Sequence, residues 1–425
     1  MMKKHLGSFI SLKVLKENYR SIIDEYKIDT LHIHLPYYID DQNPYYADKT
    51  LIPKSITIDE YKENVKFVRE LKDYGFKIYI AYPVFVSHEG INERSELLAR
   101  TLFGKVYSFR VCPTNKKIIE RIIGDIRTII DIYDIDGIIL DYIRFESPMA
   151  GFENFFMCFC DNCLKEMERK GFNPKRIVSD VSKFIDLLHT EDFVKSFINN
   201  KGLAVVDILE IYDNYPGLFE WFRFKKEHIE EIVKMLTRIM KNDGGRNFIV
   251  GANLLSPWWS LIAGQSYSSF SRIVDIIEPM LYADWMQWEG LTAVKEFSSI
   301  SGLSRDLLTN FYFVILGLAY FSGLKSFDEV RLSSLGVESI NYSMNKINIW
   351  NVGGAKIWPV LMVNPLDFIH KFLNERLSNK STMNKEFLLE SVRILKENNA
   401  DGLVFFMFDR GDKEALKEAA KVWFE

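Results

Sequence analysis

Residues 136–145, DGIILDYIRF, join an apolar run to polar side chains that could carry out acid–base chemistry. Residues 137–140 read as a strand buried on both faces, and Asp141, Tyr142, Arg144 and Glu146 follow almost at once. A carboxylate at the open end of an apolar strand needs a compensating partner or a function. Asp141 is therefore the first candidate for a catalytic group, with Arg144 as its orienting partner or a hydrogen-bond donor to substrate. A purely structural Asp141–Arg144 salt bridge is the alternative.

A second carboxyl group is needed if the chemistry is glycosidic cleavage, where one acts as acid and the other as nucleophile or base. Residues 274–282, VDIIEPMLY, supply Glu278 within a predicted strand, and Asp284 follows just beyond it. Alternation along the strand puts Glu278 and Tyr282 on one face. An inward Glu278 among apolar walls would favour the protonated form that a general acid needs. The competing interpretation is a structural ion pair, for example with Lys356, and Glu146 is the third candidate carboxylate.

Aromatic and imidazole side chains follow the same predicted strands. Flat aromatic faces can cover the C–H faces of sugar rings, and we expect a binding role here, with ordinary packing beneath long loops as the alternative. The residues concerned are Trp258, Trp259, Trp285 and Trp288, with Tyr37 and Tyr38 after an earlier strand. His32 and His34 form an H-x-H that resembles the opening motif of amidohydrolase-type metal barrels. None of the seven histidines lies on the later strands where that site needs its other ligands, so we expect His32 and His34 to line the pocket.

The four cysteines of the chain are Cys112, Cys158, Cys160 and Cys163. Three of them crowd into CFCDNC, which is a poor layout for a disulfide framework and favours a reduced, cytoplasmic setting. Cys112 follows one predicted strand and the triplet follows the next, so the four thiols can meet in space. We expect a structural zinc site here, with four free buried thiols as the competing interpretation.

The elements that must position these residues alternate between strand and helix. Predicted strands cover 29–35, 76–85, 107–111, the opening run 136–145, 247–255, 274–282, 355–363 and 400–408, with amphipathic helices between them. Thr114 is expected to cap the helix that follows 107–111. Eight strands in βα order predict parallel pairing and a (β/α)8 TIM barrel, in which reacting groups lie at the carboxyl ends of the strands. An open doubly wound sheet is disfavoured because PYYIDDQNP, after the first predicted strand, has no Gly-rich phosphate loop.

Composition narrows the class of protein further. The 425 residues are 48% hydrophobic, enough for one barrel domain, 1–425, with loop insertions at about 143–218 and about 283–354. A net charge of −4, without a basic stripe, gives no indication of nucleic acid binding. We find neither a signal peptide nor an 18-residue apolar run and expect no membrane partner. The oligomeric state is not predictable.

Several motifs together resemble those of the glycoside-hydrolase-like TIM barrels, a group related to the α-amylase and α-galactosidase superfamily. They are Cys112-Pro113-Thr114-Asn115, the run Asp136 to Phe145, the Cys158–Cys163 piece, and Asp275 to Tyr282. The resemblance covers about 107–290 and implies a carbohydrate-active barrel in which Asp141 occupies the position of a catalytic carboxylate, often the nucleophile of a retaining mechanism. The strand 247–255 ends in ANLLSPWW without the carboxylate found in related superfamilies, which moves the acid/base expectation to Glu278 or Asp284.

We therefore expect a cytoplasmic glycoside hydrolase that needs no catalytic cofactor and takes a carbohydrate substrate. Asp141 would attack or stabilise the anomeric carbon, and Glu278 or Asp284 would protonate the leaving oxygen. The side chains expected to hold the sugar are Tyr142, Arg144, Glu146, His32, His34, Tyr282, Trp258 and Trp285. The alternatives are a non-catalytic carbohydrate-binding barrel and a metal-dependent hydrolase that uses His32 and His34.

Overall fold

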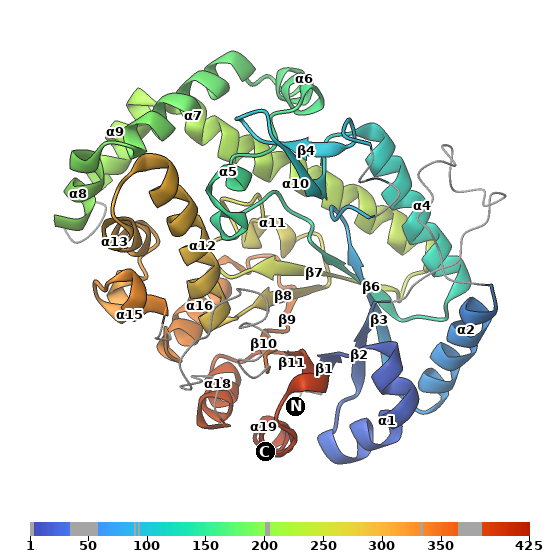
Figure 1. Cartoon of the computed structure of the whole chain (residues 1–425). Helices are drawn as coiled ribbons and strands as arrows, with labels where there is room; N and C mark the ends of the chain where they lie inside the picture. Colours follow the sequence, from blue (N-terminus) through green and yellow to red (C-terminus); the bar gives the residue numbers. More distant parts are fainter. Residues whose placement is uncertain are drawn as a thin grey trace.

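The computed structural model describes residues 4–34, 58–88, 91, 94–199, 205–331, 335–363 and 385–425. Parallel strands close into a barrel inside a ring of helices (Figure 1). Their order is β1 (His5–Phe9), β2 (Thr30–Ile33), β3 (Lys77–Pro83), β6 (Gly137–Asp141), β7 (Ile249–Leu255), β8 (Ile276–Met280), β9 (Lys356–Ile357) with β10 (Val360–Met362), and β11 (Gly402–Phe406). β9 and β10 are two halves of one strand, and β10 closes the ring by pairing with both β8 and β11. The predicted (β/α)8 fold is confirmed.

One predicted strand was wrong, and one barrel strand was missed. Residues 107–111 belong to β5 (Val106–Val111), which pairs antiparallel with β4 (Leu98–Arg100) outside the barrel. The first barrel strand is instead β1, whose sequence HLGSF carries three residues that are not typical of a buried strand. Gly7 is needed there, because a Cβ at this position would come within 2.9 Å of the His32 ring. The two errors offset each other in the count of eight.

Amphipathic helices cover the outside of the barrel (Figure 1). They are α1 (Leu12–Tyr26), α2 (Ile58–Asp73), α4 (Lys116–Ile132), α10 (Pro216–Asp243), the short α11 (Tyr267–Phe270), α16 (Glu338–Trp350), α18 (Lys385–Glu397) and α19 (Lys413–Phe424), with the 3-10 turn η3 (Phe408–Arg410) before the last. The cap of α4 is Asn115 rather than the predicted Thr114: the Asn115 side chain accepts a hydrogen bond from the Lys117 amide at 3.0 Å. Asn115 is the better placed residue because it directly precedes the first helical turn.

Two long excursions leave the carboxyl side of the barrel. The first, after β6, contains η2 (Pro148–Ala150), α5 (Phe152–Phe155), α6 (Asp161–Arg169), α7 (Pro174–Leu188), α8 (Glu191–Asn199) and α9 (Val205–Asn214). The second, after β8, contains α12 (Ala283–Ser301), α13 (Arg305–Ile315), α14 (Ala319–Ser322) and α15 (Phe327–Arg331). α13 packs on α8 and α12 on η2, so the two excursions share a hydrophobic core of their own. Within the described ranges, no helix is long and apolar enough to cross a membrane.

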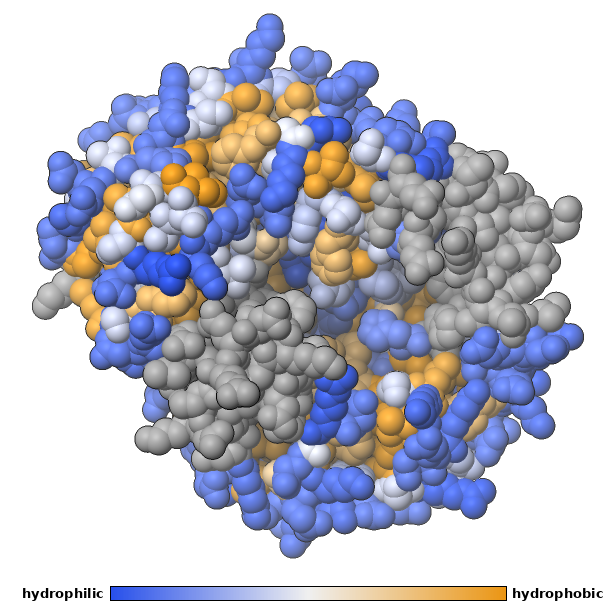
Figure 2. All heavy atoms as spheres, in the orientation of Figure 1, coloured by the Kyte–Doolittle hydropathy of each residue, from blue (hydrophilic) through white to orange (hydrophobic). Residues whose placement is uncertain are grey.

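The barrel lumen is filled by side chains rather than left as a pore. Its apolar part is a separate cluster of inward-facing residues, distinct from the large core between strands and helices. The buried members are Phe9, Tyr79, Ala81, Ile139, Ile276, Trp358, Val360 and Val404. Figure 2 shows one face of the molecule in the orientation of Figure 1, with hydrophilic residues over most of the outline and hydrophobic atoms between them in the upper left and the lower centre.

The amino end of the barrel is closed by a repeated aspartate. Every second strand, namely β2, β6, β8 and β11, is directly preceded by an Asp whose carboxylate accepts a backbone hydrogen bond from the neighbouring earlier strand. The pairs are Asp29 with Leu6 (3.3 Å), Asp136 with Ile78 (2.8 Å), Asp275 with Val250 (2.8 Å) and Asp401 with Ile357 (2.8 Å). The main-chain carbonyls of the first three also accept from the next strand, at 2.9 Å each. These aspartates therefore clamp adjacent strands together at the rim.

Candidate active site

Asp141 is the last residue of β6 and is partly exposed at the carboxyl mouth of the barrel. The strand ends here because Tyr142 adopts a positive φ of 50°, a left-handed conformation that no strand continues. The Tyr142 amide donates a hydrogen bond to Asp141 Oδ1 at 2.8 Å, which fixes the carboxylate at the turn. A carboxylate held this way at the end of a barrel strand lies where reactions occur in this fold.

A buried ion network lies directly behind Asp141. Glu146 is 3% exposed and accepts hydrogen bonds from two guanidinium groups, those of Arg110 and Arg144, the latter at 3.0 Å. Burial alone would raise the pKa of Glu146, but the two arginines outweigh it and hold that pKa below its ordinary value. Arg144 therefore pairs with Glu146, whereas the sequence pattern suggested a pair with Asp141. Arg144, the expected structural partner of Asp141, therefore belongs to the buried ion network of Glu146.

Tyr142 lies against the two arginines of this network. The Arg110 guanidinium is 4.5 Å from the Tyr142 ring centroid and that of Arg144 is 5.2 Å away. Phe109 meets the same ring edge-on at 5.9 Å. Stacking on cations holds an aromatic side chain rigidly without using its hydroxyl. Tyr142 is therefore well placed to hold a ligand beside Asp141.

Arg110 is a component that the sequence did not reveal. It is 1% exposed, and its two Nη atoms make no hydrogen bond within the described part of the chain. Arg110 lies inside YSFRV, which we interpreted as a barrel strand, and this interpretation hid its role. A lone arginine two residues before Cys112 in such a strand could have indicated a buried charged group.

Lys225 of α10 is a second component that was missed. Its Nζ lies 3.7 Å from the Trp221 ring centroid, is fully buried, and makes no hydrogen bond to the described residues. Burial lowers the pKa of Lys225 well below its ordinary value, and the nearby charge of Glu146 only partly opposes this. In sequence it lies in the charged run FRFKKEHIEE and resembles any solvent-exposed helical lysine, so no sequence signal marked it.

Glu278 points into the lumen from β8 and is 0% exposed. Its Oε1 lies 2.6 Å from Nε2 of His32 on β2, which is also fully buried. The structural partner of Glu278 is thus His32 on the far side of the barrel, and the suggested pair with Lys356 does not form. Gly7 provides the space for the His32 ring, and Phe9 stacks on it at 4.9 Å.

Three polar atoms in this part of the lumen make no hydrogen bond to the described protein. They are Glu278 Oε2, His32 Nδ1 and Oδ1 of Asn253, the residue opposite Glu278 in the β7–β8 register. A buried polar group without a partner is costly, and such groups concentrate at functional sites. The lumen beneath Asp141 is therefore polar where a typical barrel interior would be hydrocarbon.

His34 is exposed at the end of β2, with its ring 6.2 Å from that of Phe9. His32 and His34 therefore differ in environment, one locked to Glu278 and the other facing solvent. In the parts of the chain that the structure describes, neither histidine belongs to a group of three or more potential metal ligands. The metal-dependent alternative gains no support from this geometry.

The aromatic candidates divide into several environments. Trp259 is 1% exposed and belongs to the core of the excursions, while Trp258 is partly buried and stacks on Tyr342 at 4.6 Å. Tyr282 stacks on Phe406 at 5.4 Å beside the lumen. Asp284, Trp285 and Trp288 lie in the first turns of α12, but their side chains are outside the described residues. Tyr37 and Tyr38 also lie outside the described residues.

The four cysteines converge beside the β4–β5 hairpin. Their sulfur atoms all lie within 4.8 Å of one another, with Cys112 Sγ 3.2 Å from Cys160 Sγ and 3.7 Å from Cys163 Sγ. Tetrahedral zinc bonds of about 2.3 Å would require sulfur separations of roughly 3.8 Å, so the set fits four-thiolate coordination. The Arg100 amide donates to Cys158 Sγ at 3.4 Å, the kind of contact that supports a thiolate. Hydrogen bonds from the neighbouring thiols lower the pKa of Cys160.

A further polar network surrounds His88, which follows β3. Tyr82 donates to Asp125, and Arg121 lies 3.4 Å from the same carboxylate. Both ring nitrogens of His88 are buried and make no hydrogen bond in the described regions. Burial, reinforced by the positive charge of Arg121, lowers the pKa of His88 to about 4. His88 is therefore neutral near pH 7.

The chain matches no protein-family model and no curated protein sequence. Its fold is similar to that of the PgaB (BpsB) glycoside hydrolase domain from Bordetella bronchiseptica, with a TM-score of 0.57 at 12% identity, over 98% of this chain and 99% of that one. It is also similar to the β-galactosidase from Halorubrum lacusprofundi (TM-score 0.57, 10% identity, 99% of this chain and 57% of that one). The β-galactosidase from Marinomonas ef1 gives the same TM-score at 10% identity, over 99% of this chain and 59% of the other. At such identities the likeness establishes the shared barrel.

Proposed function

We propose that this chain is a glycoside hydrolase that uses Asp141 at the carboxyl mouth of the barrel. The observation that carries the proposal is the position of Asp141: partly exposed, fixed by the Tyr142 amide, and placed at the end of β6 before a rigid ion network. The similar barrels from B. bronchiseptica and H. lacusprofundi are named as a glycoside hydrolase domain and a β-galactosidase, which supports the same class of reaction here.

In the proposed reaction Asp141 acts on the anomeric carbon, either as a nucleophile or as the base that activates water, while a second carboxyl group protonates the leaving oxygen. Tyr142 directly follows Asp141, and we assign it to sugar binding together with His34, Tyr282, Trp258 and Trp285, while the buried Arg144–Glu146 pair supports Tyr142. The distance between the two catalytic carboxyl groups distinguishes the outcomes: roughly 5 Å for retention and roughly 6.5–9.5 Å for inversion.

The second carboxyl group is Glu278 or Asp284. Glu278 has an unpaired Oε2 and a histidine partner that can supply or remove a proton, but it has no solvent-exposed surface. Asp284 lies in the first turn of α12, which follows the carboxyl end of β8. Glutamine or asparagine at each position removes the transferable proton with little change of shape, so paired variants separate the two candidates.

A non-catalytic carbohydrate-binding barrel is the second candidate function. The burial of Glu278 favours it, because a carboxyl group locked to His32 inside the lumen is remote from solvent and from a glycosidic oxygen at the mouth. Under this reading Asp141 and the aromatic side chains would bind sugar hydroxyls and ring faces without turnover.

We further propose that Cys112, Cys158, Cys160 and Cys163 hold a structural zinc ion. Such an ion would tie the segment after β5 to the start of α6, because Cys112 lies in the former and the other three precede or begin the latter. Catalysis itself needs no cofactor. All four cysteines are unpaired as disulfides, and a reducing compartment such as the cytoplasm suits them.

The test of the enzymatic proposal compares the wild-type chain with Asp141→Asn on a panel of p-nitrophenyl glycosides and oligosaccharides. We expect kcat to fall by about 10³-fold or more while the melting temperature and the sugar affinity are retained. Glu278→Gln and Asp284→Asn are measured in parallel. In the variant that lacks the acid, the loss of activity should be smaller on substrates with good leaving groups than on substrates with poor ones. Equal turnover by wild type and Asp141→Asn would overturn the assignment, and sugar binding without any turnover would establish the binding barrel.

A further inference from the structure

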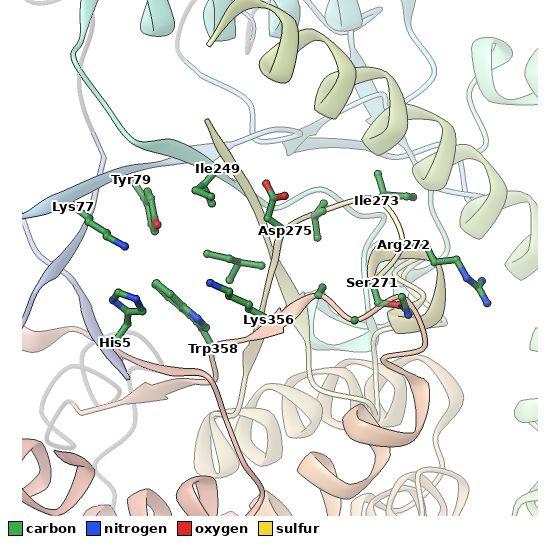
Figure 3. A pocket seen from close by; sticks show the side chains of 15 residues that line it. His5, Lys77, Tyr79, Ile249, Ser271, Arg272, Ile273, Asp275, Lys356 and Trp358 are labelled. Carbon is green, nitrogen blue, oxygen red and sulfur yellow. Dashed lines mark hydrogen bonds between the residues drawn. The ribbon is translucent and has the colours of Figure 1, made fainter. Parts of the chain in front are cut away.

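A cavity lies at the opposite end of the barrel from Asp141. It has a volume of about 550 Å³ and opens among the amino-terminal ends of the strands. His5 of β1, Lys77 and Tyr79 of β3, Asp275 before β8, Lys356 of β9 and Trp358 line it (Figure 3). The proposed hydrolase reaction uses none of these residues.

The floor of this cavity is aromatic and rigid. Trp358 is 1% exposed and stacks on the His5 ring at 5.2 Å, and the Tyr79 ring lies 6.0 Å from the Trp358 ring. His5 is fixed in turn by Asp29, whose carboxylate lies 3.0 Å from His5 Nδ1. The Trp358 Nε1 hydrogen has no acceptor within the described part of the protein. An indole N–H buried at the lining of a cavity is a hydrogen-bond donor available to a ligand.

The charge of the lining is positive. Lys77 and Lys356 come from the first positions of two strands on different sides of the barrel, and their ammonium groups extend into the same hollow beside Tyr79 and Trp358 (Figure 3). Among the described residues, neither lysine forms an ion pair. The single carboxylate of the lining, Asp275, is already neutralised by Lys241 at 2.5 Å. Arg272 also lines the cavity, but its guanidinium points away from the two lysines (Figure 3). Two cations without an ion pair therefore face the hollow, together with neutral donors.

The size and chemistry of the cavity define the ligand. A cavity of this volume is far larger than one inorganic anion and lies in the usual range for small-molecule sites. Ammonium groups bind the oxygens of a dianion by charge-assisted hydrogen bonds, and the indole adds a neutral donor. The apolar surfaces of Ile249 and Ile276 in the same lining leave room for the body of a small molecule.

We infer that the amino end of the barrel binds a small phosphomonoester, with the phosphate between Lys77 and Lys356 and its body over Trp358. The group that the site recognises is the phosphate dianion, and the molecule that carries it is polar and about the size of a monosaccharide. This site lies beyond the proposed hydrolase reaction and does not depend on it, because its residues face the other end of the lumen.

The experiment measures binding by isothermal titration calorimetry at pH 7.5, with glucose 6-phosphate, adenosine monophosphate, inorganic phosphate and glucose as probes. For the wild-type chain we expect a phosphomonoester to bind more tightly than inorganic phosphate, and glucose not to bind at this end. The double variant Lys77→Gln/Lys356→Gln should weaken phosphomonoester binding by about 100-fold, since each lost ammonium contact is worth about tenfold. The matched control is Lys13→Gln/Lys62→Gln, which removes two exposed lysines of α1 and α2 and should leave the affinity unchanged.

Trp358→Phe provides a second, charge-neutral test, and we expect it to weaken binding several-fold while the aromatic floor is kept. All variants are compared by melting temperature, so a loss of binding in a folded variant is attributable to the site. The two phosphomonoester probes distinguish a sugar body from a nucleoside body, and tighter binding of either supports the inference. The inference is overturned if no phosphomonoester binds to the wild-type chain. It is also overturned if Lys77→Gln/Lys356→Gln and Lys13→Gln/Lys62→Gln weaken phosphomonoester binding equally.

Discussion

The aspartates at the amino end of this barrel and the polar side chains toward its carboxyl end differ in how their polar atoms are paired. At the amino end, four aspartates each pair with a backbone amide of a neighbouring strand, so every second strand is locked to the one before it. At the carboxyl end, Tyr142 takes a left-handed conformation, and Glu278 and His32 keep one polar atom each without a partner. Satisfied groups stabilise the fold, whereas unsatisfied buried groups cost stability and persist where they serve a function.

The repeated aspartate is only partly marked in the sequence. Asp-Gly steps occur at 136–137 and 401–402, and such steps are also typical of ordinary turns. The structure places Asp136 and Asp401 in the same capping role as Asp29 and Asp275, on alternate strands. The capping aspartate is thus repeated four times, and two of the four, Asp29 and Asp275, are not marked in the sequence because no glycine follows them.

The largest stability effect expected at the carboxyl end is that of Glu146→Gln. Removing this charge leaves the buried guanidinium groups of Arg110 and Arg144 without their carboxylate, and we expect the free energy of unfolding at pH 7 to fall by about 3 kcal/mol. Urea denaturation measures the change. Glu153→Gln, at a more exposed pair with Lys105, is the control and should cost less than about 0.5 kcal/mol.

This effect has a defined pH dependence. The pKa of Glu146 is lower in the folded chain than in the unfolded one, so its stabilising contribution is present above about pH 4.3 and is lost as the pH falls through the folded pKa. Wild type and Glu146→Gln should therefore converge in stability at low pH. A constant difference between pH 7 and the acid limb would mean that packing, rather than charge, holds this network.

A smaller effect is expected at the amino end. Asp401→Ala removes the acceptor of the Ile357 amide at the start of β9 and should lower the free energy of unfolding by about 1–2 kcal/mol. Activity or ligand binding at the carboxyl mouth should not change, in contrast to Asp141→Asn. Asp401→Asn keeps an acceptor oxygen in the same place and should recover most of the loss. Loss of activity in a folded Asp401→Ala chain would contradict the conclusion that the amino end stabilises the fold independently of the carboxyl end.

The effect of His88 is the smallest at neutral pH, because it appears only at acid pH. Because burial lowers the pKa of His88 to about 4, the unfolded chain takes up a proton between about pH 6.5 and pH 4 that the folded chain does not. This group therefore makes wild-type stability fall as the pH is lowered through that window. His88→Gln should flatten the slope and leave the stability at pH 8 nearly unchanged, as thermal unfolding at a series of pH values would show. An identical slope in both chains would contradict the buried, neutral state of His88.

The sequence by itself determined the barrel and the position of Asp141 on it. The period of apolar residues along 137–140, 247–255 and 400–408 is local information, and eight βα units in succession have few ways to pack. The meeting of the four cysteines was also expected from the sequence, although the reason was incorrect: Cys112 follows β5 of the β4–β5 hairpin, not a barrel strand. The first strand escaped because its burial depends on Gly7 fitting against His32, and residues 107–111 were misassigned because antiparallel pairing leaves the same local pattern.

Only the tertiary structure decided which charged groups face each other. Glu278 meets His32 across 246 residues of sequence, Arg110 reaches Glu146, and Lys225 is buried among aromatic rings although its helix segment is highly charged. Such pairs depend on barrel closure and strand stagger, which bring together side chains whose order along the chain carries no record of their meeting. Lys77 and Lys356 converge at the amino end for the same reason. Local hydrophobic periodicity specifies the strands and helices of the barrel. Closure of the barrel determines which side chains meet at its two ends.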